Sequence, residues 1–182
     1  VRLLATRLQT HARFAATLDD AYIKMLAASA PLHDIGKVGI PDSILQKPGK
    51  LTPEEWEIMK THSKLGSDAI EQAERDMDRP VEFLALAKEV AHWHHERWDG
   101  RGYPDGLKED AIPLSARLMT MADVFDALIS KRCYKDAMPL AEVADIISSE
   151  RDRQFDPDIT DAFLAGCEEF AAIAAQHSDS AT

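Results

Sequence analysis

The sequence predicts an all-α protein folded as one helical bundle. Apolar residues recur with the 3.6-residue period of a helix through most of the chain, and no segment alternates apolar and polar residues as a half-buried strand does. Most of these periodic segments begin at a proline, which is favoured in the first turn of a helix. The 182 residues, 45% of them hydrophobic, suffice for one buried core. Because no repeat or low-complexity linker interrupts the chain, we expect one domain over residues 1–176 and a polar tail at 177–182.

The first third of the chain contains two predicted helices. The first extends from the start to about residue 18, and its apolar stripe consists of Leu4, Leu8, Ala12 and Ala15. The second covers residues 20–32 and leads directly into the pair His33-Asp34. Glycine and proline punctuate residues 36–49, so this segment is expected to be a loop with one short turn.

Five further helices are predicted from capping and proline signals. Thr52, followed by Pro53 and Glu55, has the pattern of a capping box, in which the threonine and glutamate side chains bond free amides of the first turn. The helix that starts there carries on one face Trp56, Met59, Gly66 and Ile70. The others are expected from Pro80 to about His95, from Pro113 to about Ser130, from Pro139 and from Pro157, with a frayed end from Gln176 onward.

Charge and cysteine content narrow the functional classes. The net charge of −11 argues against general binding to nucleic acid or to an anionic membrane. No apolar run approaches the roughly 20 residues that cross a bilayer, and the N-terminal stretch lacks the apolar core of a signal peptide. The two cysteines, Cys133 and Cys167, predict no disulfide framework and favour a reducing, cytoplasmic location. Because the chain begins at Val1 rather than at methionine, we expect it to be truncated at the N-terminus.

Four separate segments supply imidazoles and carboxylates suited to metal ions. A carboxylate beside a histidine, as in His33-Asp34, can bridge two cations. Adjacent helical residues diverge by about 100°, so His94 and His95 suit two metals with one imidazole each, unless the helix end is unwound. Each motif alone also fits a plainer role, as a capping pair, a core histidine or surface histidines. The candidate ligands are His33, Asp34, His62, His94, His95 and Asp123.

Asp123 lies in an unusual setting for a carboxylate. It falls opposite the main apolar stripe of its predicted helix, yet its neighbours there are alanine, methionine and threonine rather than charged residues. A carboxylate in apolar surroundings needs a cation or dense hydrogen bonding. The mixed histidine and aspartate set favours Fe, Mn or Zn over Ca or Mg, and two such ions can activate water against a phosphodiester.

Basic residues beside these segments are candidates for holding phosphate. Arg132 and Lys135 follow the helix that carries Asp123, and Lys37 stands three residues after Asp34. Arginine can hold phosphate oxygens in a bidentate manner, and lysine acts as a point charge. The alternative for Arg132 and Lys135 is a solvated helix end favoured by the helix dipole.

In order and spacing these motifs resemble those of the HD-GYP family, a branch of the HD phosphohydrolase superfamily. The match covers most of residues 1–165. The resemblance implies an HD-domain helical bundle that hydrolyses cyclic di-GMP to the linear dinucleotide pGpG, and in some members onward to GMP, through a metal-bridged hydroxide in bacterial second-messenger signalling. The matching segments are His33-Asp34-Ile35-Gly36-Lys37, Ile40-Pro41-Asp42, Lys47-Pro48-Gly49-Lys50-Leu51, His62, His94-His95-Glu96, Gly102-Tyr103-Pro104, Ala122-Asp123-Val124-Phe125-Asp126-Ala127-Leu128, Arg132 and Tyr134-Lys135.

By position, the resemblance also implies roles for the site residues. Asp34 and Lys37 would take part in catalysis, Arg132 and Lys135 would hold substrate phosphate, and the Gly102-Tyr103-Pro104 loop would shape the rim of the substrate site. In some relatives this loop contacts partners such as diguanylate cyclase (GGDEF) domains, and many relatives follow a receiver or other sensor domain, as in response regulators. Two or three divalent ions, commonly Fe or Mn, with Zn or Ni as alternatives, would be held by His33, Asp34, His62, His94, His95 and Asp123.

The chain departs from the family pattern in its first helix, where relatives usually carry a further histidine ligand. Alignment from His33 places that position at or just before Val1, and His11 is too close to His33 to replace it. A second departure is Cys133, where proline is common. Two other interpretations stay open: a catalytically degenerate module that binds a cyclic dinucleotide or protein partners, and a phosphodiesterase for 3′,3′-cyclic GMP-AMP.

Overall fold

The computed structural model describes residues 1–77, 81–130 and 138–178, and this part of the chain is all-α, as the sequence predicts. Within it no strand forms, and extended pairing is limited to one isolated bridge between Arg151 and Phe155. None of the described helices is long and apolar enough to cross a membrane.

The connections between the helices range from the single residue between α4 and α5 to the long segment between α6 and α7. The N-terminal part contains α1 (Arg2–Leu8), α2 (Asp20–Ser29), α3 (Asp42–Leu45), α4 (Pro53–Lys60) and α5 (His62–Arg75). The C-terminal part contains α6 (Glu82–Trp93), α7 (Leu114–Ile129), α8 (Leu140–Ser149), α9 (Pro157–Leu164) and α10 (Cys167–Ser178). Short 3₁₀ helices lie between some of them, namely η1 (Ala30–Leu32), η2 (Ile35–Gly39) and η3 (Glu109–Ala111).

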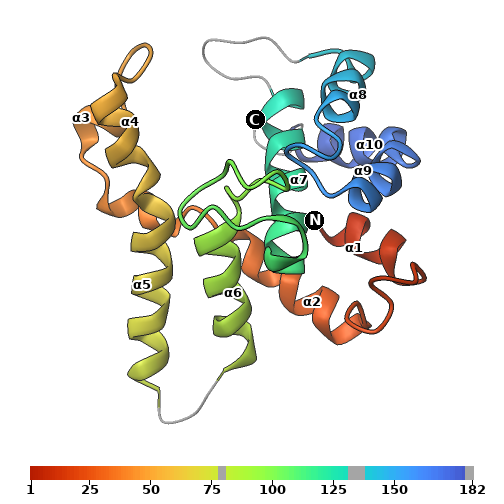
Figure 1. Ribbon diagram of the computed structural model, residues 1–182, viewed down its shortest axis with the longest axis horizontal. Coiled ribbons are helices and arrows are strands. Elements are labelled where there is room, and N and C mark those ends of the chain that lie inside the picture. Colours follow the sequence, from red (N-terminus) through yellow and green to blue (C-terminus); the bar gives the residue numbers. More distant parts are fainter. Residues whose placement is uncertain (78–80, 131–137, 179–182) are drawn as a thin grey trace.

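Helix α7 runs through the middle of the molecule (Figure 1). On one side it packs with α1, α2, α8, α9 and α10 around the main apolar core. On the other side α5 and α6 pack against each other as a pair, with a small cluster of Ile70, Ala87 and Ala91 between them. Helices α3 and α4 stand at one end of this pair, away from the main core.

The first helix is shorter than predicted. It ends at Leu8, and the next ten residues form consecutive turns. The predicted stripe is wrong beyond that point, because Ala12 and Ala15 are exposed while Phe14 and Leu18 are buried. The turns bring these two large apolar side chains into the core, and their burial outweighs the helix propensity of the alanines.

The helix predicted from Thr52 through Ile70 is in fact two helices. Its start is confirmed: Thr52 Oγ1 accepts from Glu55 N at 3.2 Å, and Glu55 Oε2 accepts from Thr52 N at 2.7 Å. The chain then breaks at Thr61, between α4 and α5, where the threonine hydroxyl donates to a carbonyl of the last turn of α4. Because of the break, Trp56 shares no buried face with Ile70 and is 47% exposed.

Two other segments contain more helix than expected, while α2, α6, α7 and α8 lie close to their predicted positions. Residues 36–49 hold most of η2 and all of α3 instead of a single turn. The helix predicted from Pro157 divides near Gly166 into α9 and α10, and α10 continues through Gln176, which was expected to fray. The division lets Phe163 and Phe170 stack in the core with their ring centroids 4.8 Å apart.

Candidate metal centre

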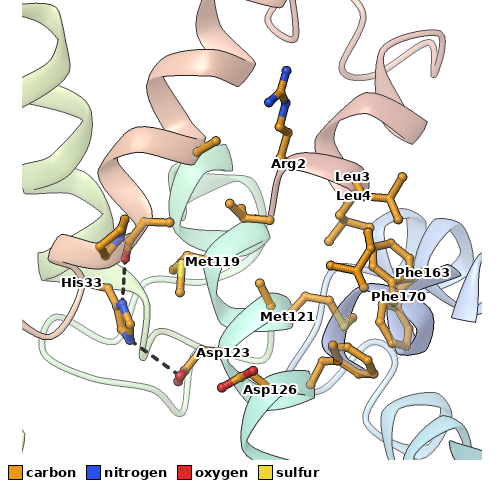
Figure 2. Close-up of a pocket in the computed structure, with 18 of the residues that line it drawn as sticks. Arg2, Leu3, Leu4, His33, Met119, Met121, Asp123, Asp126, Phe163 and Phe170 are labelled. Atoms are coloured by element: carbon orange, nitrogen blue, oxygen red, sulfur yellow. Dashed lines mark hydrogen bonds and ion pairs between the residues drawn. The ribbon is translucent and has the colours of Figure 1, made fainter. Parts of the chain in front are cut away.

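One side of the site is formed by His33, which follows η1, and Asp123, which lies in the second half of α7. Nδ1 of His33 donates to the carbonyl of Ala30 at 2.7 Å, which turns Nε2 toward two carboxylates. Nε2 lies 3.3 Å from Oδ2 of Asp34 and 3.6 Å from Oδ1 of Asp123. Figure 2 shows the His33 ring pointing from its own segment toward Asp123 on α7.

The other side is a cluster of three histidines. His62 begins α5, His94 ends α6 and His95 follows it, and one ring nitrogen of each lies within 4.8 Å of the others. The Nε2 atoms of His62 and His95 are 3.2 Å apart. Nδ1 of His62 donates to Met59 O at 2.7 Å, and Nδ1 of His94 to Val90 O at 2.9 Å. These two bonds leave both Nε2 lone pairs directed into the cluster.

Asp34 lies between the two sides. Its Oδ2 is 3.3 Å from Nε2 of His33 and 2.5 Å from Nζ of Lys37. Its Oδ1 is 3.5 Å from Nε2 of His62 and 4.0 Å from Nε2 of His94. One carboxylate thus presents a different oxygen to each set of histidines, which is the arrangement a bridging ligand requires.

The electrostatics provide neutral imidazoles next to charged carboxylates. Burial and the neighbouring histidines lower the pKa of His94 to about 4 and that of His95 to about 3. Burial opposes ionisation of Asp34 and Asp123, yet hydrogen bonds from His33 hold the pKa of both carboxyls below the usual range. Burial alone would lower the pKa of His33, but the same two carboxylates raise it to about 10. At neutral pH the cluster therefore offers free lone pairs and the carboxylates offer negative charge.

This donor set fits a transition-metal ion. Two imidazole nitrogens on one ion, each with a bond of about 2.0–2.1 Å, lie roughly 3.0–3.4 Å apart, and the 3.2 Å between the Nε2 atoms of His62 and His95 falls in that range. Nε2 of His94 is buried and has no hydrogen-bond partner among the described residues. A buried polar atom of this kind is costly unless something binds it. Imidazole and carboxylate ligands without thiolate suit Fe, Mn, Zn or Ni.

Close backbone contact brings the His33-Asp34 segment against α5. A Cβ added at Gly36 would lie 1.9 Å from the carbonyl oxygen of His62 and 2.4 Å from the backbone nitrogen of Gly66. Only glycine therefore allows η2 to approach α5 so closely. That approach sets the distance between Asp34 and His62.

The segment after His95 forms a loop that covers the histidine cluster. The buried Glu96 holds this loop, because its Oε1 accepts from the amides of Asp105 at 2.7 Å and Gly106 at 3.0 Å. Tyr103 stacks on His95, with ring centroids 4.7 Å apart and planes at 26°. A Cβ at Gly102 would lie 2.4–2.6 Å from backbone atoms of residues 95–97, so the loop can fold back on itself only with glycine there.

A second set of contacts ties this loop to α5 and α6. Asp105 Oδ2 lies 3.1 Å from Nε2 of His92 and accepts from Nε1 of Trp93 at 2.8 Å. Nδ1 of His92 lies 2.7 Å from the hydroxyl of Ser67 on α5. His92 thus has a structural role, because it supports the loop that carries Tyr103.

A large cavity of about 930 Å³ opens beside His33 and Asp123. Figure 2 shows residues of its walls, among them Met119 and Met121 of α7 and Leu3 and Leu4 of α1. Most of its lining is apolar, so the cavity adjoins the metal-binding groups without extending their polar character.

All six candidate ligands come together in the structure, and the exception allowed for an unwound helix end applies to His94 and His95. His94 and His95 do not diverge, because α6 ends at Trp93 and their ring centroids lie 3.9 Å apart. Arg132 and Lys135 lie outside the described residues, so their predicted phosphate contacts stay predictions.

Sequence reasoning assigned no role to Thr120 or Glu96. The hydroxyl of Thr120 donates to the carbonyl of His94 at 2.7 Å and so fixes the end of α6 against α7. A buried threonine in an otherwise apolar helix was the available signal. For Glu96 the signal was a carboxylate directly after two candidate ligands.

Comparison with known proteins agrees with this fold. A family model described as an HD domain matches residues 4–159. The chain is 52% identical over 181 residues to a cyclic di-GMP phosphodiesterase of Vibrio cholerae, covering 100% of this chain and 37% of that protein. It is 42% identical over 162 residues to a 3′3′-cGAMP-specific phosphodiesterase 2 of the same organism, covering 89% of this chain and 30% of that protein.

A solved structure also resembles the chain. The crystal structure of a cyclic GMP-AMP-specific phosphodiesterase of V. cholerae aligns with 96% of this chain and 48% of its own, with a TM-score of 0.55 and 18% sequence identity. At that identity the likeness concerns the fold alone.

The chain therefore belongs to the HD-domain family. Its motifs and its curated relatives place it, within that family, in the HD-GYP branch. It spans 37% and 41% of the length of the two V. cholerae proteins at 52% and 50% identity, so what those whole proteins do is not thereby established for this chain.

Proposed function

We propose that this domain hydrolyses cyclic di-GMP to pGpG, and further to GMP if the linear product rebinds, at a centre of two divalent metal ions. The observation that carries the proposal is the position of Asp34, with Oδ2 facing His33 and Oδ1 facing His62 and His94. Divalent ions in such a site supply Lewis acidity to a phosphodiester and make water nucleophilic at neutral pH.

The residues of this chain then bind and orient the substrate. Lys37 reaches Asp34 at 2.5 Å and is 40% exposed, so its ammonium can neutralise a phosphate oxygen or protonate the leaving 3′-oxygen. The Gly102-Tyr103-Pro104 loop forms the rim above His95. We further propose that Arg132 and Lys135 contact the phosphate of the cyclic dinucleotide that is not being hydrolysed.

Iron or manganese is the proposed metal, with zinc or nickel as alternatives that the same ligands accept. Two groups of ligands support two ions: His33, Asp34 and Asp123 for one, and Asp34 with the three histidines for the other. A third ion would need ligands beyond these six.

An alternative substrate is 3′,3′-cyclic GMP-AMP, because relatives at 42% and 38% identity are named as phosphodiesterases specific for it. A diguanylate cyclase domain is a proposed partner of the loop, and a receiver or sensor domain is a proposed neighbour, as in the relative named a response regulator. The cysteine content favours a cytoplasmic location.

Turnover of both cyclic dinucleotides by the purified protein, with Mn²⁺ or with anaerobic Fe²⁺, tests the proposal. We expect cyclic di-GMP to disappear and pGpG to form, with a dependence on added metal that EDTA abolishes. Separation of pGpG from GMP by chromatography shows where hydrolysis stops.

The Asp123→Ala variant, with Asp126→Ala as its matched control, ties turnover to the site. Both residues are carboxylates of α7, but Asp126 is exposed and bonds only Ser130 nearby, at 3.3 Å, among the contacts described. We expect Asp123→Ala to lose activity by at least a hundredfold and Asp126→Ala to keep it. Turnover by Asp123→Ala at the normal rate, or no turnover by the unmodified protein with either Mn²⁺ or anaerobic Fe²⁺, would contradict the proposal.

A further inference from the structure

Helix α4 is unusual because none of its residues is buried although it carries large apolar side chains. Trp56 is 47% exposed and Ile58 is 42% exposed. The helix packs against α3 and α5 and stands beside the loop that covers the histidines (Figure 1). The exposed part of the Trp56 ring is available to stack on another planar group.

The contacts of Trp56 lead directly into the metal centre. Its ring meets that of Tyr103 edge to face, with centroids 6.4 Å apart at 82°. Tyr103 in turn stacks on His95 at 4.7 Å, and His95 contacts His62 with ring centroids 5.0 Å apart. A continuous run of rings therefore connects the exposed surface of α4 with the cluster.

A cation accompanies these rings. Nζ of Lys60 lies 5.8 Å from the centroid of Tyr103 and 2.8 Å from the exposed Glu57. Lys60 stands one helical turn after Trp56, so both side chains emerge on the same face of α4. Lys60 thus places an ammonium beside the ring of Tyr103, where Glu57 is its partner in an ion pair.

We propose that α4 forms the base-binding wall of the substrate site, with Trp56 stacking on a purine of the cyclic dinucleotide and Lys60 contacting its phosphate or sugar edge. This inference rests on the proposed function, and it specifies which residues hold the nucleotide outside the metal centre. A phosphate held at the cluster carries its nucleoside outward over Tyr103, and Trp56 is the next exposed ring in that direction. Stacking does not distinguish one purine from another, because every base offers a π face. Trp56 therefore contributes affinity for cyclic di-GMP and cyclic GMP-AMP alike.

Five variants test the proposal. Trp56→Ala removes the ring and Trp56→Phe keeps an aromatic face. Ile58→Ala is the matched control, because it truncates an exposed apolar side chain of the same helix about 200° away around its axis. Lys60→Gln is compared with Lys64→Gln, which removes an exposed lysine of α5 that pairs with Asp68.

Binding and turnover are measured on the same proteins. Isothermal titration of cyclic di-GMP into the EDTA-treated protein gives the dissociation constant without metal, and steady-state kinetics with Mn²⁺ give kcat and KM. We expect Trp56→Ala to weaken binding and raise KM by about tenfold for both cyclic dinucleotides, with kcat and metal content unchanged. Trp56→Phe should retain most of the affinity, Ile58→Ala and Lys64→Gln should match the unmodified protein, and Lys60→Gln should raise KM severalfold at low salt.

Each result decides between interpretations. An unchanged dissociation constant and KM in Trp56→Ala would overturn the inference, even if the protein hydrolyses cyclic di-GMP as proposed. Equal losses in Trp56→Ala and Ile58→Ala would overturn it too, since they would show that α4 matters through its own stability. Binding that weakens in Trp56→Ala while the unmodified protein shows no turnover would support the wall and refute the phosphodiesterase. Absence of both binding and turnover in the unmodified protein would refute both.

Discussion

Asp34 and His62 face each other across two different segments, with Oδ1 of the carboxylate 3.5 Å from Nε2 of the imidazole. The other oxygen of Asp34 is occupied with His33 and Lys37. The pair is therefore the point at which the carboxylate side of the centre joins the histidine cluster. A substitution of His62 removes a ligand from the histidine cluster alone, whereas a substitution of Asp34 affects both the cluster and the side formed by His33 and Asp123.

Removing His62 is expected to cost one bound metal ion. The His62→Ala variant lacks one of the two Nε2 atoms that lie 3.2 Å apart, so the cluster loses a ligand while His33 and Asp123 keep theirs. A metal present at a hundred times its dissociation constant stabilises a protein by about 2.7 kcal/mol. We expect Mn²⁺ to raise the melting temperature less in His62→Ala than in the unmodified protein, and metal analysis to find about one ion fewer per chain. The control is His11→Ala, which removes a histidine from the turns between α1 and α2. Equal metal content in both variants would refute the assignment of His62 as a metal ligand.

A side chain at Gly36 should separate η2 from α5. In Gly36→Ala the new Cβ would meet the carbonyl oxygen of His62 at 1.9 Å, and two backbones cannot yield as a side chain can. Overpacking of this kind costs about 1–3 kcal/mol, and it also moves Asp34 from His62. Urea unfolding measures the loss. Gly39→Ala is the matched control on the same 3₁₀ helix, since its Cβ would meet only the flexible end of Leu65 at 3.0 Å; equal losses in both would contradict the close-approach argument.

The loop over the histidines should loosen when Asp105 is changed. Asp105→Ala removes the bonds to His92 and Trp93 but leaves the backbone bonds to Glu96 in place. We expect amide hydrogen exchange in residues 102–107 to speed up by about tenfold, equivalent to about 1.4 kcal/mol of local stability, while exchange in α7 stays the same. Lys108→Ala, an exposed residue near the loop, serves as the control. Unchanged exchange in Asp105→Ala would mean that Glu96 alone holds the loop.

Arg13 should contribute more to stability than its surface position suggests. It bonds Asp110 at 2.7 Å and Asp156 at 3.1 Å and also contacts Asp158. The side chain of Asp156 is fully buried, so Arg13→Ala leaves this carboxylate with Arg117 as its remaining basic partner. We expect a loss of about 2 kcal/mol in urea unfolding.

An exposed ion pair provides the comparison for Arg13. Arg151 bonds Asp161 through two contacts of 2.9 Å, but both side chains are substantially exposed. Arg151→Ala should therefore cost less than about 1 kcal/mol. A loss in Arg13→Ala no larger than that in Arg151→Ala would show that the burial of Asp156 adds nothing.

Local signals predicted the helices whose ends depend on local chemistry. The capping box at Thr52 and the proline before α7 act through their own neighbours, so the sequence placed both starts correctly. The end of α1 depends instead on the packing of Phe14 in the core, which involves residues distant in the sequence. The break at Thr61 depends on how α5 packs. No proline or glycine lies next to Thr61 to signal a helix end in the sequence.

The candidate ligands could be recognised because imidazoles and carboxylates are scarce in apolar helices. Their convergence could not be derived in the same way. His94 and His95 meet in one cluster only because α6 ends at Trp93, and Asp34 reaches His62 only because η2 and α5 touch at Gly36. Both conditions are properties of packing between distant segments. The contacts by which Glu96 and Asp105 hold the loop could not be predicted from the sequence either, because they also depend on packing between separate segments.

The carbonyl of Met59 would connect the proposed nucleotide-binding wall with the candidate metal centre. It belongs to the last turn of α4, and it accepts the hydrogen bond that fixes the ring of His62. A ligand that moved α4 would therefore act on the ring of His62 through this bond, and an ion that fixed the ring would act on α4 in return. Thermodynamic linkage requires the two effects to be equal in free energy: the metal should tighten nucleotide binding by the same factor by which the nucleotide tightens metal binding.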